Sequence, residues 1–424
     1  MKKILIILAI AFPLVLQAQS LEQCQQAAEQ NYPLIRQYDL IAQTTDLTVS
    51  TIGKAWLPQV SATAQATLQS DVTAWPDQMA TMLNQMGVDV KGINRDQYRV
   101  GVDVVQTVFD GGRIRGQQEV ARQQGDVQAA QTQVSLYAVR QRVNEMYFGL
   151  LLLDDQIKLN QDLLDLLDAN EKKLASMYKR GTAAEADYNS MKAERLNVAQ
   201  QLTALQSRRN VLATMLGTFC GIEISQVQKP ELPATDPASS DNKRPELSLV
   251  DAQLRLANAR ERLLDAALLP QVSLFAQGYY GYPGYNMFES MMSHKWSLNG
   301  MVGARLTWNI GALYTRHNDK ARLQLERQSA ENNRDVFLHN NNLEQMKCSE
   351  EVARYRQLMA ADQEIIALRE KVRKAAESKL AHGIIDVNDL VKEINSENAA
   401  RVQQSIHEID LLKSIYNLKY ATNN

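Results

Sequence analysis

Two uninterrupted helical runs constrain this chain more than any other feature of its sequence. Residues 113–178 contain no proline, and only Gly116, Gly125 and Gly149 weaken a helix there. As one α-helix these 66 residues would extend about 100 Å at ~1.5 Å per residue. A second run, residues 312–382, has neither proline nor glycine. Two helices of this length do not fit into a compact globule, so the sequence predicts an elongated assembly.

Both runs carry apolar residues spaced alternately four and three positions apart. These are Val139, Val143, Met146, Leu150, Leu153 and Ile157 in the first run, and Ala361, Ile365, Leu368, Val372 and Ala375 in the second. This spacing winds an apolar seam around a partner helix, as in a coiled coil. Each long helix is therefore predicted to pack along another helix.

The N-terminus has the pattern of an export signal. Lys2 and Lys3 precede an apolar run over residues 4–16 that is too short to span a bilayer and is followed by the small residue Ala18. We predict a secretory signal peptide over residues 1–18. Without its two lysines the chain carries 44 basic and 48 acidic side chains, which argues against a nucleic-acid partner. No later run of about 18 apolar residues exists, so any membrane contact is expected through strands or the surface.

The sequence offers no clear chemical site. The three cysteines, Cys24, Cys220 and Cys348, lie far apart in no metal-ligand spacing and are expected to act as small apolar residues, although a bridge such as Cys24–Cys348 stays open. The five histidines form no ligand or triad spacing. We therefore predict a protein that is not an enzyme, without catalytic residues, metal or cofactor.

An internal duplication organises the chain. Residues 57–61 and 269–273 both read Leu-Pro-Gln-Val-Ser, and each is preceded by a further proline 25 positions before its own. The period of roughly 200 residues is too long for a solenoid. The predicted repeats are residues 19–242 and 243–424.

Behind each Leu-Pro-Gln-Val motif the apolar period changes from helical to two. Strands are expected at about 57–70, 97–109, 270–282 and 296–309; in the first, Val60, Ala62 and Ala64 alternate with Ser61 and Thr63. A small apolar face opposite a polar one is typical of a transmembrane β-barrel wall. The alternative is an ordinary sheet on a soluble core, but no separate apolar element is available to cover this face.

Matched turns follow the strands in each repeat. Phe109-Asp110-Gly111-Gly112 and Trp308-Asn309-Ile310-Gly311 are predicted corners where a strand becomes a helix, with Asp110 as the cap, because their spacing fits no nucleotide-binding loop. Long helices are expected at about 113–180 and 312–382, and return helices at about 183–216 and 386–420. Residues 217–242 are predicted to be a linker without regular structure.

These features together resemble the TolC-like outer-membrane efflux proteins, also called outer-membrane factors. The resemblance rests on the duplicated halves, the Leu-Pro-Gln-Val and Phe-Asp-Gly-Gly motifs, and Arg180-Gly181-Thr182 followed by Asp187. It implies a mixed α and β fold, in which a long α-helical coiled-coil barrel joins a transmembrane β-barrel. Three chains would contribute four strands each to a twelve-stranded homotrimer, because four strands alone leave open edges in lipid.

The resemblance also implies a function. The protein would be an exit duct in the cell outer membrane, with a large periplasmic portion, that passively conducts substrates from a periplasmic adaptor protein and an inner-membrane transporter. The alternative is a trimeric coiled-coil surface or scaffold protein without a transport role, which explains the long helices but gives the amphipathic strands no purpose. The cargo is not predicted.

Two sets of site residues follow from the resemblance. The turns are expected to be adaptor docking tips, formed by Lys179, Arg180, Gly181 and Thr182, and by Ala381, His382, Gly383 and Ile384. Asp386 and Asp389 are expected to line the pore constriction as two rings of carboxylates that attract cations. Lys392 could pair with Asp389 and weaken its ring. The alternatives are glycines that only break helices and acids that only cap one.

Overall fold

A computed structural model describes residues 18–423, except 89, 91 and 234–241. All but the last residue of the predicted signal peptide therefore lies outside the described residues. The chain divides into two compact units. We call Met1–Tyr38, Ala130–Leu249 and Asn333–Asn424 the hairpin unit, and Asp39–Ala129 with Val250–Asn332 the strand unit.

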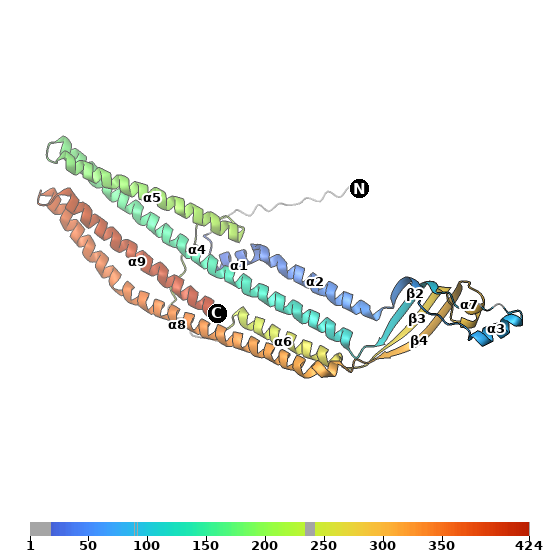
Figure 1. Cartoon of the computed structure of the whole chain (residues 1–424). Helices are drawn as coiled ribbons and strands as arrows, with labels where there is room; N and C mark the ends of the chain where they lie inside the picture. The colour runs from blue at the N-terminus through green and yellow to red at the C-terminus, as the bar shows by residue number, and fades with distance from the viewer. Residues whose placement is uncertain (1–17, 89, 91, 234–241, 424) are drawn as a thin grey trace, which may run out of the picture. The chain divides into compact units, whose positions relative to one another are not determined.

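The hairpin unit is built from two antiparallel helix pairs (Figure 1). The C-terminal part of α4 (Arg113–Lys179) pairs with α5 (Glu185–Cys220), and that of α8 (Ala312–Ala381) pairs with α9 (Val387–Thr422). The return helices have 36 residues each, against 67 and 70 in the long helices. Each return helix can therefore pack along only about half of its long helix, and a second short helix is expected along the other half.

The predicted linker is wrong at its start, because residues 217–220 belong to α5. Leu216 and Cys220 are buried, so the apolar face favours helix until Gly221, which ends it in the left-handed conformation at φ +69°. Beyond this point Gln19 and Val227 form a parallel bridge.

Two apolar cores hold the hairpin unit together. The first joins α1 (Leu21–Asn31) to α4, α5 and α9, around the fully buried Tyr147 and Leu412. The second lies behind the two turns and takes residues from all four hairpin helices: Leu163, Leu167, Leu174, Met191, Val198, Ala376, Val387, Leu390 and Ile394. The two hairpins therefore pack against each other near their turns.

The two predicted seams have different outcomes. Val139, Val143, Met146 and Leu150 of α4 are buried. The stripe on α8 is exposed, with Ile365, Leu368 and Val372 at 45%, 53% and 45%. The prediction that this seam packs along a helix is not met within one chain, because α8 instead buries the neighbouring Ile366 and Ala376.

The strand unit contains one antiparallel sheet in the order β1, β2, β3, β4. The strands are β1 (Gln59–Leu68), β2 (Asp96–Phe109), β3 (Gln271–Tyr282) and β4 (Ser297–Thr307). The connections β1–β2 and β3–β4 hold the short helices α3 (Asp77–Gln85) and α7 (Met287–Met292). Because β1 and β4 are the edges, neither has a strand partner on its outer side among the residues that the structure describes.

Helices α2 (Arg36–Gly53) and α6 (Pro245–Ala266) precede the two sheet halves, and single 3-10 turns lie at Pro33–Ile35 and Lys54–Trp56. In the strand unit, Gln118 Nε2 of α4 donates to the Val49 carbonyl of α2 at 3.0 Å. Arg316 of α8 pairs with Asp265 of α6 at 2.9 Å. These two helices are the second short partners of α4 and α8. None of the described helices combines the length and the apolar character needed to cross a membrane.

The first strand-to-helix corner is built as predicted. Asp110 is buried, and its carboxylate accepts the backbone N–H of Gly112 at 2.9 Å and of Ile114 at 2.6 Å. Gly111 and Gly112 adopt φ +68° and +87°. The second corner differs, because Gly311 is not in the left-handed region. Only the first corner therefore requires glycine for its backbone conformation.

Candidate functional site

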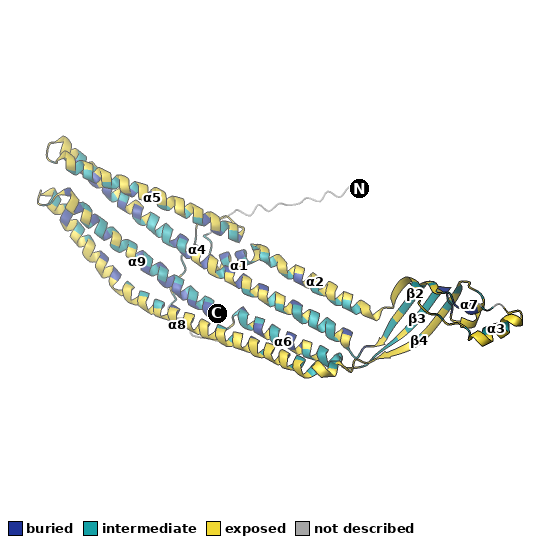
Figure 2. Cartoon of the chain, in the orientation of Figure 1, coloured by how far each residue is buried: buried dark blue, intermediate teal, exposed yellow. Residues whose placement is uncertain are grey.

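The register of the sheet separates an apolar face from a polar one. Residues paired across antiparallel strands point to the same face. Three successive rows are apolar throughout: Val60, Val104, Ala276 and Val302; Ala62, Val102, Gly278 and Gly300; Ala64, Val100, Tyr280 and Leu298. This face is open, with Val60, Leu298 and Val302 exposed by 67%, 82% and 81%, and Figure 2 draws β4 largely as exposed.

Aromatic side chains lie at both ends of the strands. At the end near α7, Trp296 packs against Tyr98 and Tyr280, with ring centroids 6.4 and 5.4 Å apart. At the other end, Trp308 donates from Nε1 to the Leu268 carbonyl at 2.9 Å. Aromatic residues at both borders of an apolar band are typical of a membrane-spanning barrel wall.

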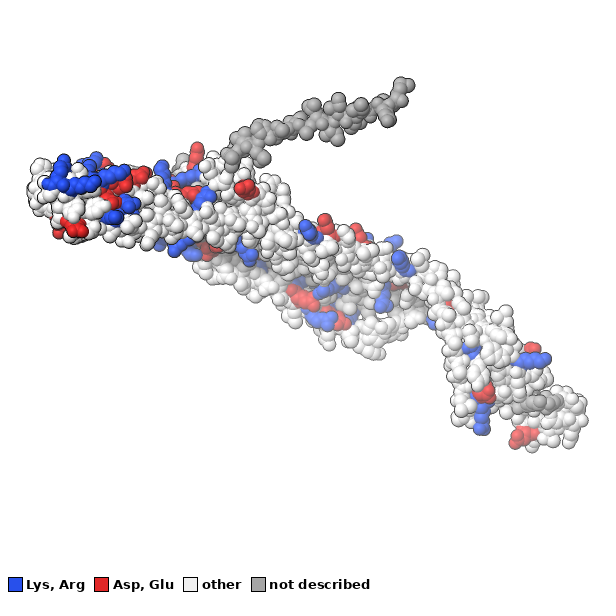
Figure 3. Space-filling model, turned by 90° about the horizontal axis from the view of Figure 1, so that it is seen from above, with Lys and Arg blue, Asp and Glu red and all other residues white. Residues whose placement is uncertain are grey.

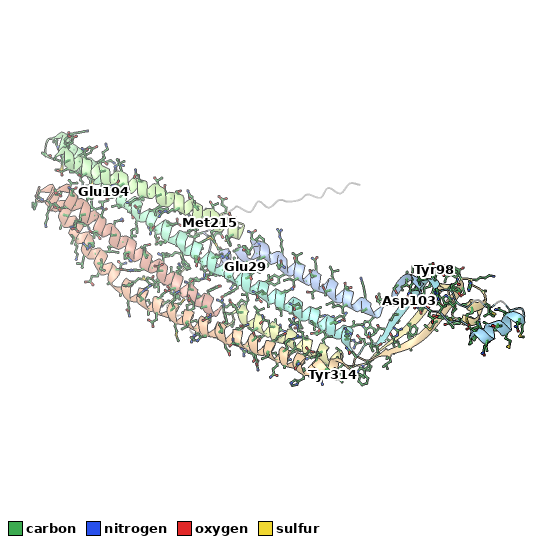
Figure 4. The ribbon with its side chains drawn as sticks, viewed as in Figure 1. Glu29, Tyr98, Asp103, Glu194, Met215 and Tyr314 are labelled. Atoms are coloured by element: carbon green, nitrogen blue, oxygen red, sulfur yellow. The ribbon has the colours of Figure 1, made fainter. Side chains whose placement is uncertain are left out.

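The opposite face is polar and carries charge. Its rows include Ser61, Asp103, Gln277 and Met301, then Thr63, Gly101, Tyr279 and Asn299, then Gln65, Arg99, Gly281 and Ser297. Asp103 accepts a hydrogen bond from the Thr63 hydroxyl at 3.4 Å, and Figure 4 labels it on β2. This face suits contact with water and solutes.

The first hairpin turn presents all four of its predicted docking residues to solvent. Lys179, Arg180, Gly181 and Thr182 are exposed. Gly181 adopts φ +71°, and its N–H donates to the Tyr178 carbonyl at 2.9 Å. The N–H of Thr182 reaches back to the Met177 carbonyl, also at 2.9 Å. The turn is thus closed by its own backbone.

The second hairpin turn repeats this geometry. Ala381, His382, Gly383 and Ile384 are all exposed, Ile384 by 69%. Gly383 adopts φ +68°, and the Ile384 N–H donates to the Lys379 carbonyl at 2.9 Å. A Cβ added at Gly181 or Gly383 would have no neighbour within 4 Å. Glycine is therefore required by the backbone here, and the space around both turns is open to a partner.

The two acids behind the second turn have different local roles. Asp386 is the N-cap of α9, and its carboxylate accepts the Asp389 N–H at 2.9 Å. Both Asp386 and Asp389 are exposed, while Val387 and Leu390 between and beyond them are buried. Within the described part of the chain, no ion pair joins Lys392 to Asp389. The cap alternative thus holds for Asp386, and the Asp389 carboxylate stays available.

The sequence analysis did not predict two ion pairs, one in each hairpin, that join the two helices of that hairpin. Glu171 of α4 bonds Arg195 of α5, and Arg373 of α8 bonds Glu397 of α9. In both hairpins the first residue lies ten positions before the turn glycine and the second fourteen after it. The charges are reversed between the repeats. The equal distances of these residues from the turn glycines are visible in the sequence and could have predicted both ion pairs.

Polar contacts also join the hairpins to each other. Asn395 of α9 donates to Glu194 of α5 at 2.7 Å, and Figure 4 labels Glu194 on α5. Charges of both signs gather at the turn end of the hairpin unit (Figure 3). Lys172 and Asp168 of α4 form an ion pair at 2.6 Å. Among the described residues, no group of three or more His, Cys, Asp or Glu could hold a metal ion.

Comparison with known proteins identifies the family of one segment of the chain. Residues 24–218 match the model of a family described as outer membrane efflux protein. This segment belongs to the outer membrane efflux proteins. The resemblance read from the sequence is thereby confirmed, and with it the location in the cell outer membrane with a large periplasmic portion. No curated protein matches the chain.

Solved structures extend the likeness from the efflux-protein segment to the whole fold. The Campylobacter jejuni CmeC outer membrane channel is 13% identical at a TM-score of 0.67, over 95% of this chain and 85% of that one. The Vibrio cholerae outer membrane protein VceC is 14% identical at 0.65, over 95% and 94%. The open state of the Neisseria gonorrhoeae MtrE outer membrane channel is 15% identical at 0.62, over 95% and 89%. The predicted mixed α and β fold with four strands per chain is confirmed.

Proposed function

We propose that this protein is the exit duct of a tripartite efflux or secretion system and conducts substrates passively through the outer membrane. The observation that carries the proposal is the sheet with one continuous, exposed apolar face and one polar face. The apolar face would contact lipid, and the polar face would line a water-filled lumen. The family and its channel relatives support the same role.

The duct would be a homotrimer. Backbone groups at an open sheet edge cannot be left unpaired in lipid, since each costs several kcal/mol. Pairing β4 of one copy with β1 of the next removes both edges, and three copies give a barrel of twelve strands from four each. The exposed apolar stripe of α8 supports this assembly, because a neighbouring chain would cover it.

The two hairpin turns would be the docking tips for a periplasmic adaptor protein that connects the duct to an inner-membrane transporter. Both turns are exposed, closed by backbone hydrogen bonds and supported by the apolar core that joins the hairpins. Ile384 provides an exposed apolar contact on one turn, and Arg180 a charge on the other. A small surface whose backbone is held by its own hydrogen bonds suits specific docking, because little conformational entropy is lost on binding.

Asp389 and Asp386, which lies three residues before it, would line the pore constriction. In a threefold assembly each position becomes a ring of three carboxylates, which repel one another and attract cations. Because Asp386 already bonds the backbone at the start of α9, we assign the principal ring to Asp389. We propose no catalytic role for any residue.

Crosslinking in living cells tests this function. A photo-crosslinking amino acid at Thr182 or Ile384 should capture a periplasmic protein that co-purifies with an inner-membrane transporter. The same amino acid at the exposed Met86, beyond the C-terminus of α3, is the matched control and should capture neither. If the turns capture nothing beyond the control, the docking role is wrong. A scaffold protein would also leave cargo export unchanged when its gene is deleted.

A further inference from the structure

Two of the three cysteines meet in the first core of the hairpin unit. Cys24 lies on α1, and Cys220 is the last residue of α5. They are 0% and 3% exposed, and the Cys220 thiol donates to the Cys24 carbonyl at 3.3 Å. Both are free thiols in the structure. The sequence left open a bridge such as Cys24–Cys348, but the partner of Cys24 in space is Cys220.

The two thiols also interact with each other. A hydrogen bond with Cys220, together with burial, raises the pKa of Cys24. The same contact lowers the pKa of Cys220. Cys348, in contrast, lies on α8 with its sulfur 3.8 Å from a Glu344 carboxylate oxygen, and burial raises its pKa to about 11.

The contacts around this pair fix the two helix ends together. Asn31, at the end of α1, donates from Nδ2 to the carbonyls of Thr218 and Phe219 at 3.2 Å each. The rings of Tyr32 and Phe219 stack with centroids 5.8 Å apart. The folded chain thus brings the two thiols together by interactions that do not depend on the sulfur atoms.

We propose that Cys24 and Cys220 form a disulfide in the mature protein, which ties α1 to the end of α5. The periplasm is an oxidising compartment in which such bonds form and persist. The oxidant would be a protein dithiol in its disulfide form. The thiolate of one of the two cysteines attacks one sulfur of that disulfide and displaces the other as a thiolate.

The thiolate of the second cysteine then attacks the sulfur of the first in the mixed disulfide. The bond between Cys24 and Cys220 forms, and the oxidant leaves as a dithiol that has gained two electrons and two protons. Because both cysteines are buried in the folded chain, this exchange takes place during folding. The bridge closes a loop between positions 24 and 220, which restricts the unfolded chain.

Counting free thiols in the native protein tests the proposal. Cells are quenched in acid, and the denatured chain is alkylated before and after reduction and weighed by mass spectrometry. The expected result is one adduct per chain before reduction, on Cys348, and three after it. Three adducts before reduction would overturn the proposal, as would a single adduct on Cys24 or Cys220.

Three variants remove any ambiguity about the pairing and its effect. Cys348→Ser is the matched control and should give no adduct before reduction and two after. Cys24→Ser and Cys220→Ser should each leave two reactive thiols without reductant. Reductant should lower the thermal unfolding midpoint of the wild type and of Cys348→Ser, but not of Cys24→Ser or Cys220→Ser. An equal response of all four proteins would contradict a stabilising bridge.

Discussion

At the residue scale, two neighbouring carboxylates differ in what they bond to. The Asp386 carboxylate accepts the Asp389 N–H in the first turn of α9, whereas the Asp389 side chain is exposed and caps no N–H among the described residues. Asp389→Ala should therefore reduce cation selectivity, and block by multivalent cations, without lowering trimer stability. Asp386→Ala should cost about 1 kcal/mol of helix stability through the lost cap. Single-channel recordings and thermal unfolding measure these two effects.

Asp386→Asn is the control that separates charge from capping. Asparagine caps a helix about as well as aspartate but carries no charge. Stability should be kept while any contribution of the second ring to selectivity is lost. Unchanged currents in Asp389→Ala, combined with a less stable trimer, would show that Asp389 also serves only the helix end.

Gly181 and Gly383 give a second test at single positions. Both adopt a positive φ with open space around them, so leucine would fit sterically but strain the backbone by ~1–2 kcal/mol. The two-site leucine variant should lose export while its trimer and barrel persist, because the added side chains obstruct the docking surface. Cargo export in cells and gel mobility of the trimer measure both properties.

Asparagine at the same two positions is the matched control, since it tolerates the left-handed conformation better than other residues with a Cβ. It should retain most export. If export also persists in the leucine variant, docking occurs elsewhere on the surface.

At the element scale, the reversed ion pairs predict how each hairpin is held. Glu397→Gln removes a carboxylate that bonds both Arg373 and Arg401 in a partly buried interface between α8 and α9. The substitution should lower the free energy of unfolding by about 1–3 kcal/mol. The swap Arg373→Glu with Glu397→Arg reproduces the order seen in the other hairpin and should recover part of this loss. Denaturant unfolding measures both.

The exposed pair Lys172–Asp168 provides the control for this experiment. Its side chains are 77% and 44% exposed, and Lys172→Gln should leave the denaturant midpoint nearly unchanged. A Glu397→Gln effect as small as this would mean that the hairpin does not depend on its ion pair.

The sheet predicts opposite outcomes for neighbouring residues of β1. Ala64 lies in the apolar row with Val100 and Tyr280, and Thr63 lies on the polar face opposite Gly101. Ala64→Arg should impair membrane assembly by about 2–4 kcal/mol, whereas Thr63→Arg should be tolerated in a lumen. The fraction of assembled protein in outer membranes measures the difference, and equal tolerance would mean that the strand does not face lipid.

Local patterns made much of this fold predictable from the sequence. Alternation around Val60 to Ala64 identifies a strand with two unlike faces, and Asp110 before two glycines identifies a cap and a corner. The exposure of Ile365 and Leu368 could not be predicted from the sequence, because the spacing of an apolar stripe is the same whether it packs on its own chain or on another. The meeting of Cys24 with Cys220 depends on tertiary packing between distant segments, which no local pattern encodes.

At the scale of the whole molecule, the described part of one chain leaves three features without partners. They are the outer edges of β1 and β4, the apolar face of the sheet, and the stripe on α8. Lipid accounts for the apolar face of the sheet but not for the strand edges, and neighbouring copies account for the edges and the stripe. An oligomeric channel therefore satisfies the whole set at once.

The most direct test of this account is single-channel recording of the purified wild-type protein in planar bilayers, with trimer and monomer fractions separated in mild detergent. The trimer fraction should give discrete, uniform conductance steps, and the monomer fraction should give none, because only the closed assembly surrounds a polar lumen. Uniform steps from a stable monomer, or a membrane-inserted trimer that never conducts, would contradict the account.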